Sequence, residues 1–169
     1  MEEQLFGPVR FLPGENRGRY PYCNSIYIEG AGILIDPASN RERLIRLRAE
    51  HDVKMVWLSH WHEDHFMHLD LFDDIPLWVS SLDAPPLADL STFLKWYGFS
   101  EEERCFWDPI LRDQFHFRPR QPSRHLTGGE TINFGSLSVD VIATPGHTPG
   151  HRSEERRVGE ECRCRWWPV

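Results

Sequence analysis

The stretch VKMVWLSHWHEDH, residues 53–65, joins a short apolar run to a cluster of three histidines, one aspartate and one glutamate. A short, almost wholly apolar run of this kind favours a strand that is buried on both faces of a sandwiched sheet. The polar cluster then lies at the carboxyl end of that strand. Imidazole and carboxylate groups are the common ligands of zinc in proteins. The stretch therefore predicts a metal site at the end of a buried strand.

The spacing within this cluster indicates which side chains share a metal ion. Alternate side chains of an extended segment point the same way, so His60 and His62 are expected to project together. Catalytic zinc takes three protein ligands and keeps a fourth position for water. We expect His147 to be the third ligand, because it follows another predicted strand within TPGHTPGH, residues 144–151. The prolines and glycines around His147 predict a rigid loop that can approach the pair.

Two more side chains of the cluster carry alternative roles. Asp64 and His65 are predicted to hold a second metal ion, or Asp64 to act as the base that orients an attacking water. Isolated histidines are more often structural or solvated than metal-binding, so we expect no first-metal role for the others. Of these, His51, His116 and His125 are predicted to be solvated or capping, while His68 and His151 are predicted to be structural rather than supporting the ligands.

The first third of the chain predicts a hairpin-rich sheet followed by a helix. Residues 8–39 carry Ile, Val, Leu, Tyr and Phe between glycines and prolines, which is typical of short strands. Asn40 is expected to cap a helix over residues 41–51, because Asn accepts from free N–H groups at a helix start. The helix is predicted to cover the sheet with one apolar side, formed by Leu44, Ile45 and Leu47.

Residues 83–118 predict a helical insertion between two sheet regions. A first helix is expected to begin at a capping Asp83 and end at Gly98. A second helix is expected to begin with a capping box and to be interrupted or kinked near Pro109. Period-two alternation then returns over residues 128–143 and predicts a hairpin, whose last strand leads to His147. The capping box consists of Ser100 and Glu103.

Composition excludes several classes of protein. The 169 residues are 40% hydrophobic and carry a formal charge of −7, with no basic stripe before residue 151, so we expect no nucleic-acid partner. No apolar run approaches the ~20 residues of a membrane span, so no membrane association is expected. The start MEEQLFGPVR lacks the apolar core of a secretion signal, and four scattered cysteines do not form a disulfide framework. A cytoplasmic protein with a small-molecule substrate is the prediction.

The two histidine motifs together resemble a known family. SHWHEDH followed by TPGHTPGH, with ILIDPAS upstream and GGETINFG ahead of the third histidine, resembles the metallo-β-lactamase superfamily over residues 8–151. The resemblance implies an α/β (α+β) fold, the four-layer αββα sandwich, with the metal site at one edge of its sheets. It implies a metal-bound hydroxide that attacks an ester, thioester, lactone or related bond. The implied ligands are His60, His62 and His147 for the first metal, and Asp64 and His65 for the second.

The resemblance implies Zn²⁺ as cofactor, as one or two ions, with iron or manganese as alternatives. An iron-dependent redox member of the same superfamily is a rival interpretation. His62 argues against the flavin-partnered di-iron branch, where the resemblance leads us to expect Glu at this position.

The end of the chain departs from the family pattern. Relatives are expected to continue past the third histidine with a bridging aspartate and a later histidine, but the 18 residues after His151 contain neither residue type. We therefore expect residues 1–151 to be the N-terminal part of the domain. Residues 152–169 change composition abruptly to Arg, Glu and Trp, and are expected to be foreign to the domain and disordered or helical. A truncated, non-catalytic remnant is thus the alternative to an active hydrolase.

Overall fold

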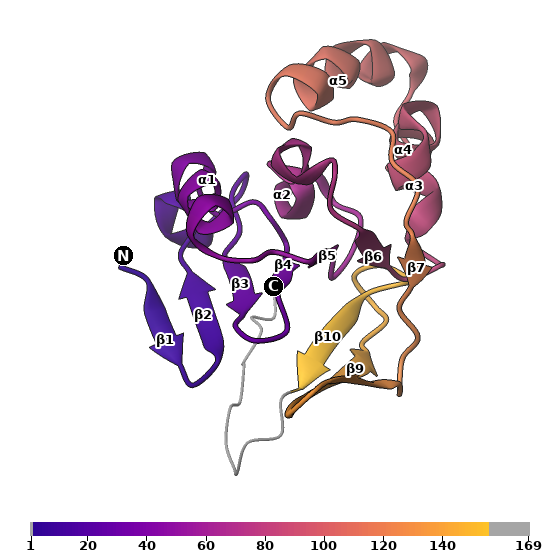
Figure 1. Ribbon diagram of the computed structural model, residues 1–169. Helices are drawn as coiled ribbons and strands as arrows, with labels where there is room; N and C mark the ends of the chain where they lie inside the picture. The colour runs from indigo at the N-terminus through magenta and orange to yellow at the C-terminus, as the bar shows by residue number, and fades with distance from the viewer. Residues whose placement is uncertain (1, 156–169) are drawn as a thin grey trace.

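The computed structural model describes residues 2–155, which form two β-sheets and a set of helices (Figure 1). The larger sheet contains seven strands in chain order: β1 (Gln4–Phe6), β2 (Val9–Leu12), β3 (Ser25–Ile28), β4 (Ile33–Ile35), β5 (Met55–Trp57), β6 (Leu77–Val79) and β7 (Arg124–His125). The smaller sheet has the order β10 (Arg152–Glu155), β9 (Leu137–Ala143) and β8 (Thr131–Phe134).

The first four strands form an antiparallel meander, which confirms the predicted hairpin-rich sheet over residues 8–39 and adds β1 before it. β1 pairs with β2, β2 with β3 and β3 with β4, each antiparallel. Gly7 adopts a φ of 59° in the β1–β2 turn, and Gly32 a φ of 70° just before β4. Glycine reaches this left-handed region at little cost, which explains these two turn positions.

The second half of the large sheet is parallel, and this positions the candidate site. β4, β5, β6 and β7 pair in parallel, in that order. Parallel strands need long crossover connections, which here contain helices. The carboxyl ends of β4, β5 and β6 consequently meet at one edge. The crossovers contain α1 (Arg41–Glu50), then α2 (Glu63–Phe66) and the 3₁₀ helix η2 (Leu69–Phe72), and then α3 (Ala84–Ala88), α4 (Leu90–Trp96) and α5 (Glu101–Asp113).

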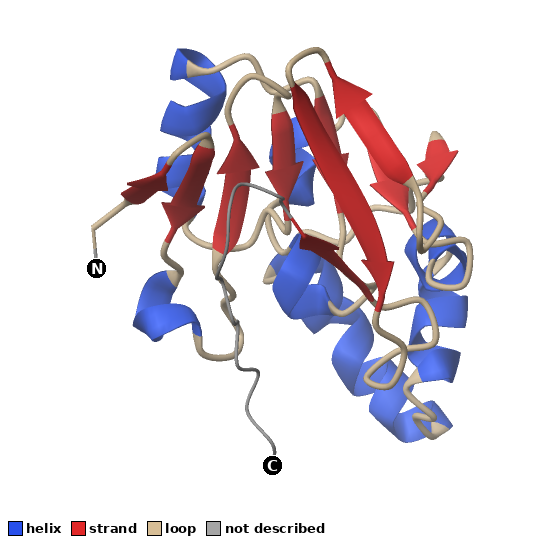
Figure 2. Cartoon of the chain, turned by 90° about the horizontal axis from the view of Figure 1, so that it is seen from below, coloured by secondary structure: helices blue, strands red, loops and turns tan. Residues whose placement is uncertain are grey.

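Alternation of side chains along the strands divides the core into two parts. Leu34 and Val56 face a cluster that includes residues of the helices, whereas Ile33, Ile35 and Trp57 face a second cluster shared with the small sheet. The molecule therefore has three layers in the order helices, large sheet, small sheet. Figure 1 shows this order from top to bottom, and Figure 2 shows the small sheet nearest the viewer, in front of part of the large one.

These three layers correspond to the first three of the predicted αββα sandwich. Within residues 2–155, no helical residue belongs to the second cluster, which contains only strand and loop residues. The α/β fold class is confirmed, and the described residues supply the N-terminal part of the sandwich. No helix of this part is long and apolar enough to cross a membrane.

The helix α1 begins as predicted but presents a narrower apolar side. The side chain of Asn40 accepts a hydrogen bond from the backbone N–H of Arg43, which is the expected cap. Leu44 and Leu47 are buried, but Ile45 is 49% exposed. The prediction for Ile45 was wrong because successive helical residues differ by about 100° in direction, so Ile45 cannot share the buried face of Leu44.

The helical insertion differs from the prediction at its start. The first predicted helix is two helices, α3 and α4, which meet at Asp89. Asp89 has an extended backbone and caps α4 by accepting from the N–H of Thr92. Asp83 makes no capping hydrogen bond, and its carboxylate binds another loop. The second predicted helix is confirmed as α5 with its complete capping box, and it continues through Pro109 without interruption.

The start of the C-terminal segment also departs from the prediction. Residues 152–155 form β10, which pairs antiparallel with β9, whereas we expected a disordered or helical segment from residue 152. Composition misled here, because strand β9 offers a free edge whose ladder of hydrogen bonds is available to any sequence without proline. The rest of the predicted foreign segment, residues 156–169, lies outside the described residues.

Candidate metal centre

Three histidines from two separate strand ends converge at one edge of the sheets. One ring nitrogen from each of His60, His62 and His147 lies within 4.8 Å of the others. The closest pair is His62 Nδ1 and His147 Nε2, which are 2.9 Å apart although 85 residues separate them in the chain. His60 is buried, His62 is half-buried and His147 is exposed. The predicted convergence is confirmed, and the cluster opens to solvent on the side of His147.

The hydrogen bonds of His60 leave one nitrogen available to a metal. Ser59 Oγ donates to Asp36 Oδ2 at 2.7 Å and lies 3.0 Å from His60 Nδ1. Because the hydroxyl proton is committed to the carboxylate, the hydroxyl oxygen accepts from Nδ1–H of His60. The Nε2 atom of His60 then carries a lone pair, and it is buried without a hydrogen-bond partner among residues 2–155. A metal ligand has this arrangement of one fixed and one free nitrogen.

The protonation states of this histidine cluster also fit a metal ion. Burial, followed by the neighbouring charge of His65, lowers the pKa of His60 well below its ordinary range. Burial, followed by the neighbouring His147, lowers the pKa of His62 to about 4. Both imidazoles are therefore neutral near pH 7, which is the form that binds a cation. Three imidazoles around an open side match the ligand set of a catalytic zinc.

Asp64 and His65 lie beside this cluster in a different environment. The ring centroids of His60 and His65 are 4.0 Å apart. His65 Nδ1 donates to Asp36 Oδ2 at 2.8 Å, and His65 Nε2 is 3.7 Å from Asp64 Oδ2. Burial opposes the charge of His65, but the carboxylate of Asp36 outweighs it and raises the pKa of His65 well above its ordinary value. Burial raises the pKa of Asp64. The two side chains are neighbours, and their role as ligands of a second metal stays a prediction.

Cys23 and Asp36 also lie beside His65, and the sequence analysis named neither of them as a potential metal ligand. The Sγ of Cys23 and ligand atoms of Asp36 and His65 lie within 4.8 Å of one another. Burial raises the pKa of the Cys23 thiol to about 11. Asp36 directly follows β4 within ILIDPAS, so its position after a buried strand was a usable signal. Cys23 lies between strands and carried no such signal.

Asp83 holds the loop of the third histidine in place. Its fully buried carboxylate accepts from Thr148 Oγ1 at 2.6 Å and from the backbone N–H of Gly150 at 2.8 Å. A Cβ atom at Gly150 would lie 2.3 Å from Asp83 Oδ1, so only glycine allows this approach. The backbone N–H of Arg152 donates to the carbonyl of Ser59 at 2.9 Å, which ties the end of the same loop to the first histidine loop.

Aromatic side chains form a wall beside His62. The ring of Tyr97, at the end of α4, stacks on His62 at 5.4 Å with an interplanar angle of 29°. Tyr97 and Tyr20 both donate their hydroxyls to the buried carboxylate of Glu63, at 2.5 and 2.9 Å. Trp61 packs edge-on against Tyr97 from below the loop. The helical insertion and the N-terminal segment therefore both contact the metal-binding loop through Glu63.

The remaining histidines divide into three groups. His151 lies beside the centre, with its ring centroid 5.0 Å from that of His60 and its Nδ1 2.7 Å from Thr144 Oγ1, and its structural role stays a prediction. His51 ends α1 and His125 is exposed in β7, as predicted. His68 and His116 form a separate cluster with Asp70, and His116 donates to the carbonyl of Met67, the C-cap residue of α2, in keeping with the expected capping role.

Comparison with known sequences agrees with these features. A probable metallo-hydrolase of Streptococcus pyogenes is 29% identical over 87% of this chain and 59% of its own length. The hydroxyacylglutathione hydrolase GloC of Haemophilus influenzae is 30% identical over 70% of this chain and 52% of its own length. The acyl-coenzyme A thioesterase MBLAC2 of Bos taurus is 27% identical over 73% of this chain and 42% of its own length. The chain spans about half the length of these curated relatives.

Solved structures share the fold. The metallo-beta-lactamase GOB-18 from Elizabethkingia meningoseptica superimposes with a TM-score of 0.63 at 22% identity, over 95% of this chain and 57% of that one. A metallo-beta-lactamase from Cronobacter sakazakii gives a TM-score of 0.60 at 23% identity, over 89% of this chain and 57% of that one. The family model of the metallo-beta-lactamase superfamily matches residues 18–159 of this chain. The chain belongs to the metallo-beta-lactamase superfamily.

Proposed function

We propose that this chain is the metal-binding half of a zinc-dependent hydrolase that cleaves a small-molecule thioester. The observation that carries the proposal is the convergence of His60, His62 and His147, with a free and buried Nε2 on His60. A bound zinc ion supplies a Lewis acid, which lowers the pKa of water and polarises a carbonyl group.

The side chains of the protein orient this chemistry. Neutral His60 and His62, with His147, hold the ion, and Ser59 and Asp36 fix the ring of His60. Asp64 lies 3.7 Å from His65 Nε2 and is the candidate base for an attacking water; burial raises its pKa, which brings it nearer to the working pH of a base.

The shape of the centre supports a bulky substrate that enters from one side. His147 is exposed, whereas the opposite side of the cluster is closed by buried His60. Tyr97 flanks the centre, since its ring stacks on His62 and is itself stacked by Phe99. Thioester is the preferred bond because two of the relatives are a hydroxyacylglutathione hydrolase and an acyl-coenzyme A thioesterase. Simple esters and lactones are the alternatives.

Zinc is the preferred metal, and one ion per chain is the expected content. Three neutral imidazoles favour zinc over magnesium or calcium, which prefer oxygen ligands. Iron and manganese are the rival ions, and iron would favour the redox alternative. A second ion has only Asp64 and His65 as nearby predicted ligands in residues 2–155.

The test is a hydrolysis assay on chain loaded with one equivalent of zinc. Release of free thiol from an acyl-coenzyme A and from a hydroxyacylglutathione is expected, with loss of turnover in His60→Ala and no change in His125→Ala. Equal turnover in the wild type and in His60→Ala would contradict the proposal. Replacing zinc by iron or manganese in the same assay separates the three ions.

A specific observation favours a second candidate, a chain that binds metal without turnover. The chain spans about half the length of its relatives, and a second ion would depend on His65, whose Nδ1 already donates to Asp36. Under this alternative, zinc binds with one equivalent but no thiol is released. A longer chain that includes the downstream residues of the gene would then regain the activity.

A further inference from the structure

A second group of metal-ligating side chains lies outside the centre described above. One ligand atom from each of His68, Asp70 and His116 lies within 4.8 Å of the others. The ring centroids of His68 and His116 are 5.7 Å apart. None of these three residues takes part in the proposed hydrolysis, so the cluster needs its own explanation.

His68 provides the first reason to expect a ligand here. Its side chain is 95% buried, as only 5% of its surface is exposed. Its Nδ1 atom is buried and has no hydrogen-bond partner among residues 2–155. A buried nitrogen without a hydrogen-bond partner destabilises the fold. A cation bound to this nitrogen removes that destabilisation.

His116 provides an independent reason. Its Nδ1 donates to the carbonyl of Met67 at 2.9 Å, so the proton is on Nδ1 and the lone pair is on Nε2. This is the arrangement that fixes the tautomer of metal-binding histidines. His116 also has a φ of 52°, a left-handed backbone that is uncommon for histidine. The chain accepts this unfavourable backbone conformation at the residue whose ring reaches the cluster.

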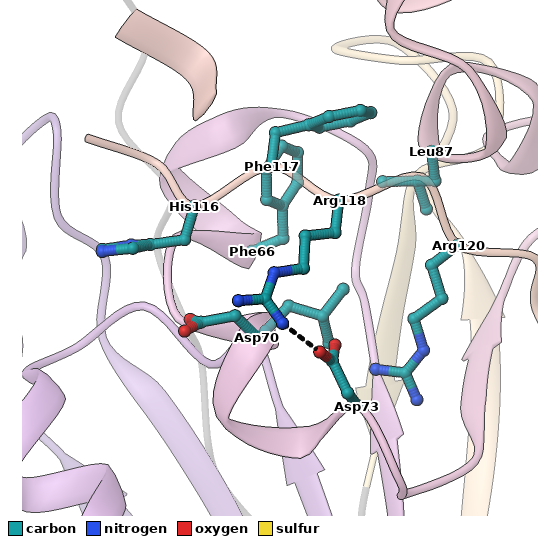
Figure 3. Close-up of a pocket in the computed structure, with 9 residues that line it drawn as sticks. Phe66, Asp70, Asp73, Leu87, His116, Phe117, Arg118 and Arg120 are labelled. Atoms are coloured by element: carbon teal, nitrogen blue, oxygen red, sulfur yellow. Dashed lines mark hydrogen bonds and ion pairs between the residues drawn. The ribbon is translucent and has the colours of Figure 1, made fainter. Parts of the chain in front are cut away.

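Asp70 completes the set with a carboxylate. Arg41 donates to both of its carboxylate oxygens, at 2.9 and 2.7 Å. Each carboxylate oxygen has a second lone pair, so the ion pair leaves room for coordination. Figure 3 shows the imidazole of His116 and the carboxylate of Asp70 on the same side of a small cavity, whereas Arg118 turns to Asp73. The side chain of Asp70 is buried rather than solvated.

We propose that His68, Asp70 and His116 bind a divalent cation of the zinc class at a second, structural site. Two imidazoles and one carboxylate suit Zn²⁺, Co²⁺ or Ni²⁺ better than Mg²⁺ or Ca²⁺. The charge of Arg41 opposes a cation, so this site binds more weakly than the three histidines of the candidate centre. The adjoining cavity of about 10 Å³ has room for one water as a further ligand.

The ion would connect three parts of the fold. His116 follows α5, while His68 and Asp70 precede and begin η2. Arg41 begins α1 and is already bound to Asp70. A cation at this site therefore fastens the end of the helical insertion to the helices that cover the large sheet, and its binding free energy adds to the stability of the fold.

The test counts zinc ions by equilibrium dialysis and calorimetry in matched variants of the whole chain. All variants carry Cys162→Ser and Cys164→Ser, so that thiolates outside the described residues contribute no zinc. The reference chain is expected to bind one more equivalent than His116→Asn. Asn suits this position because it tolerates a left-handed backbone. The control is His125→Asn, an exposed histidine, which is expected to bind as the reference does.

A second measurement separates this site from the three-histidine centre. Zinc is expected to raise the unfolding temperature of His62→Ala, which retains the proposed site, and to raise it less in the double variant His62→Ala/His116→Asn. Equal zinc content in the reference and His116→Asn, together with equal zinc-induced shifts in the two His62 backgrounds, would overturn the proposal. Failure here would leave the proposed hydrolase untouched, because that proposal depends on the other histidines.

Discussion

The two halves of the motif SHWHEDH, residues 59–65, differ in how readily their side chains can bind a metal ion. His60 and His62 are neutral near pH 7 because burial lowers their pKa, and a third histidine joins them. His65 is protonated, because Asp36 raises its pKa, and only Asp64 stands opposite its Nε2. Neighbours in sequence thus differ in protonation and in ligand number. We infer that the first half binds metal readily, whereas the second must lose a proton and gain ligands.

The largest effect expected is from removing one member of the first half. His62→Ala should weaken zinc binding at the three-histidine centre by more than ~100-fold, because one of three protein ligands is lost and supporting groups alone are worth ~10–100-fold. Zinc titration against a chelator of known affinity measures it. His125→Ala, with an exposed ring on β7, serves as the control and should bind as the wild type does. Similar losses in both variants would mean that the histidines act on folding rather than on coordination.

The second prediction concerns pH and sharpens the contrast between the halves. Metal at His65 must displace its proton, so the affinity for a second ion should rise by about tenfold per pH unit below the raised pKa of His65. His60 and His62 release no protons between pH 6 and 8, because their lowered pKa values lie below that window. The first ion should therefore depend less on pH. Calorimetric titrations at pH 6, 7 and 8 test this, and equal slopes for the two ions would contradict the assignment of charge to His65.

The third prediction concerns the hydrogen bonds by which Asp83 holds the loop of His147 beside the other two histidines. Asp83→Ala leaves two donors of the His147 loop without their buried acceptor, so zinc affinity at the three histidines should fall by about tenfold. Asp83→Asn retains one acceptor and gains a donor that the Thr148 hydroxyl can meet, so it should recover most of the affinity. If both variants bind zinc as the wild type does, the loop does not need this support.

The smallest effect expected is at the aromatic wall. Tyr97→Phe keeps the stacking on His62 but removes a hydrogen bond to buried Glu63, so the free energy of unfolding should fall by about 1–2 kcal/mol. Zinc affinity should change by less than about threefold. Urea unfolding and zinc titration of one preparation measure both quantities, and a large loss of zinc affinity would show that the hydroxyl positions the ligand.

The sequence predicted those parts of the site that depend on local geometry. Alternation in an extended segment placed His60 and His62 together, and the position of His147 after a strand identified the third ligand. The contacts of Asp83 were not predictable in this way, because its partner Thr148 is 65 residues away and a local pattern favoured a helix cap. Asp36 was recoverable, since it follows a buried parallel strand whose carboxyl end meets that of β5.

The fold was predicted to a similar extent. Hydrophobic residues between turn signals identified the strand-rich segment that forms β2–β4, and alternation identified the hairpin β8–β9, because these are local properties. The break at Asp89 was missed, since the apolar spacing continues across it and only the backbone of that residue leaves the helix. Composition could not reveal β10, whose pairing depends on an edge of β9.

The most direct test of the account is the X-ray absorption spectrum of the chain loaded with one equivalent of zinc. The account predicts three imidazole nitrogens at about 2.0 Å with no sulfur ligand, and two imidazoles at that ion in His147→Ala. A sulfur shell at about 2.3 Å, or a spectrum that His147→Ala leaves unchanged, would contradict the claim that two strand ends of this chain together hold the metal.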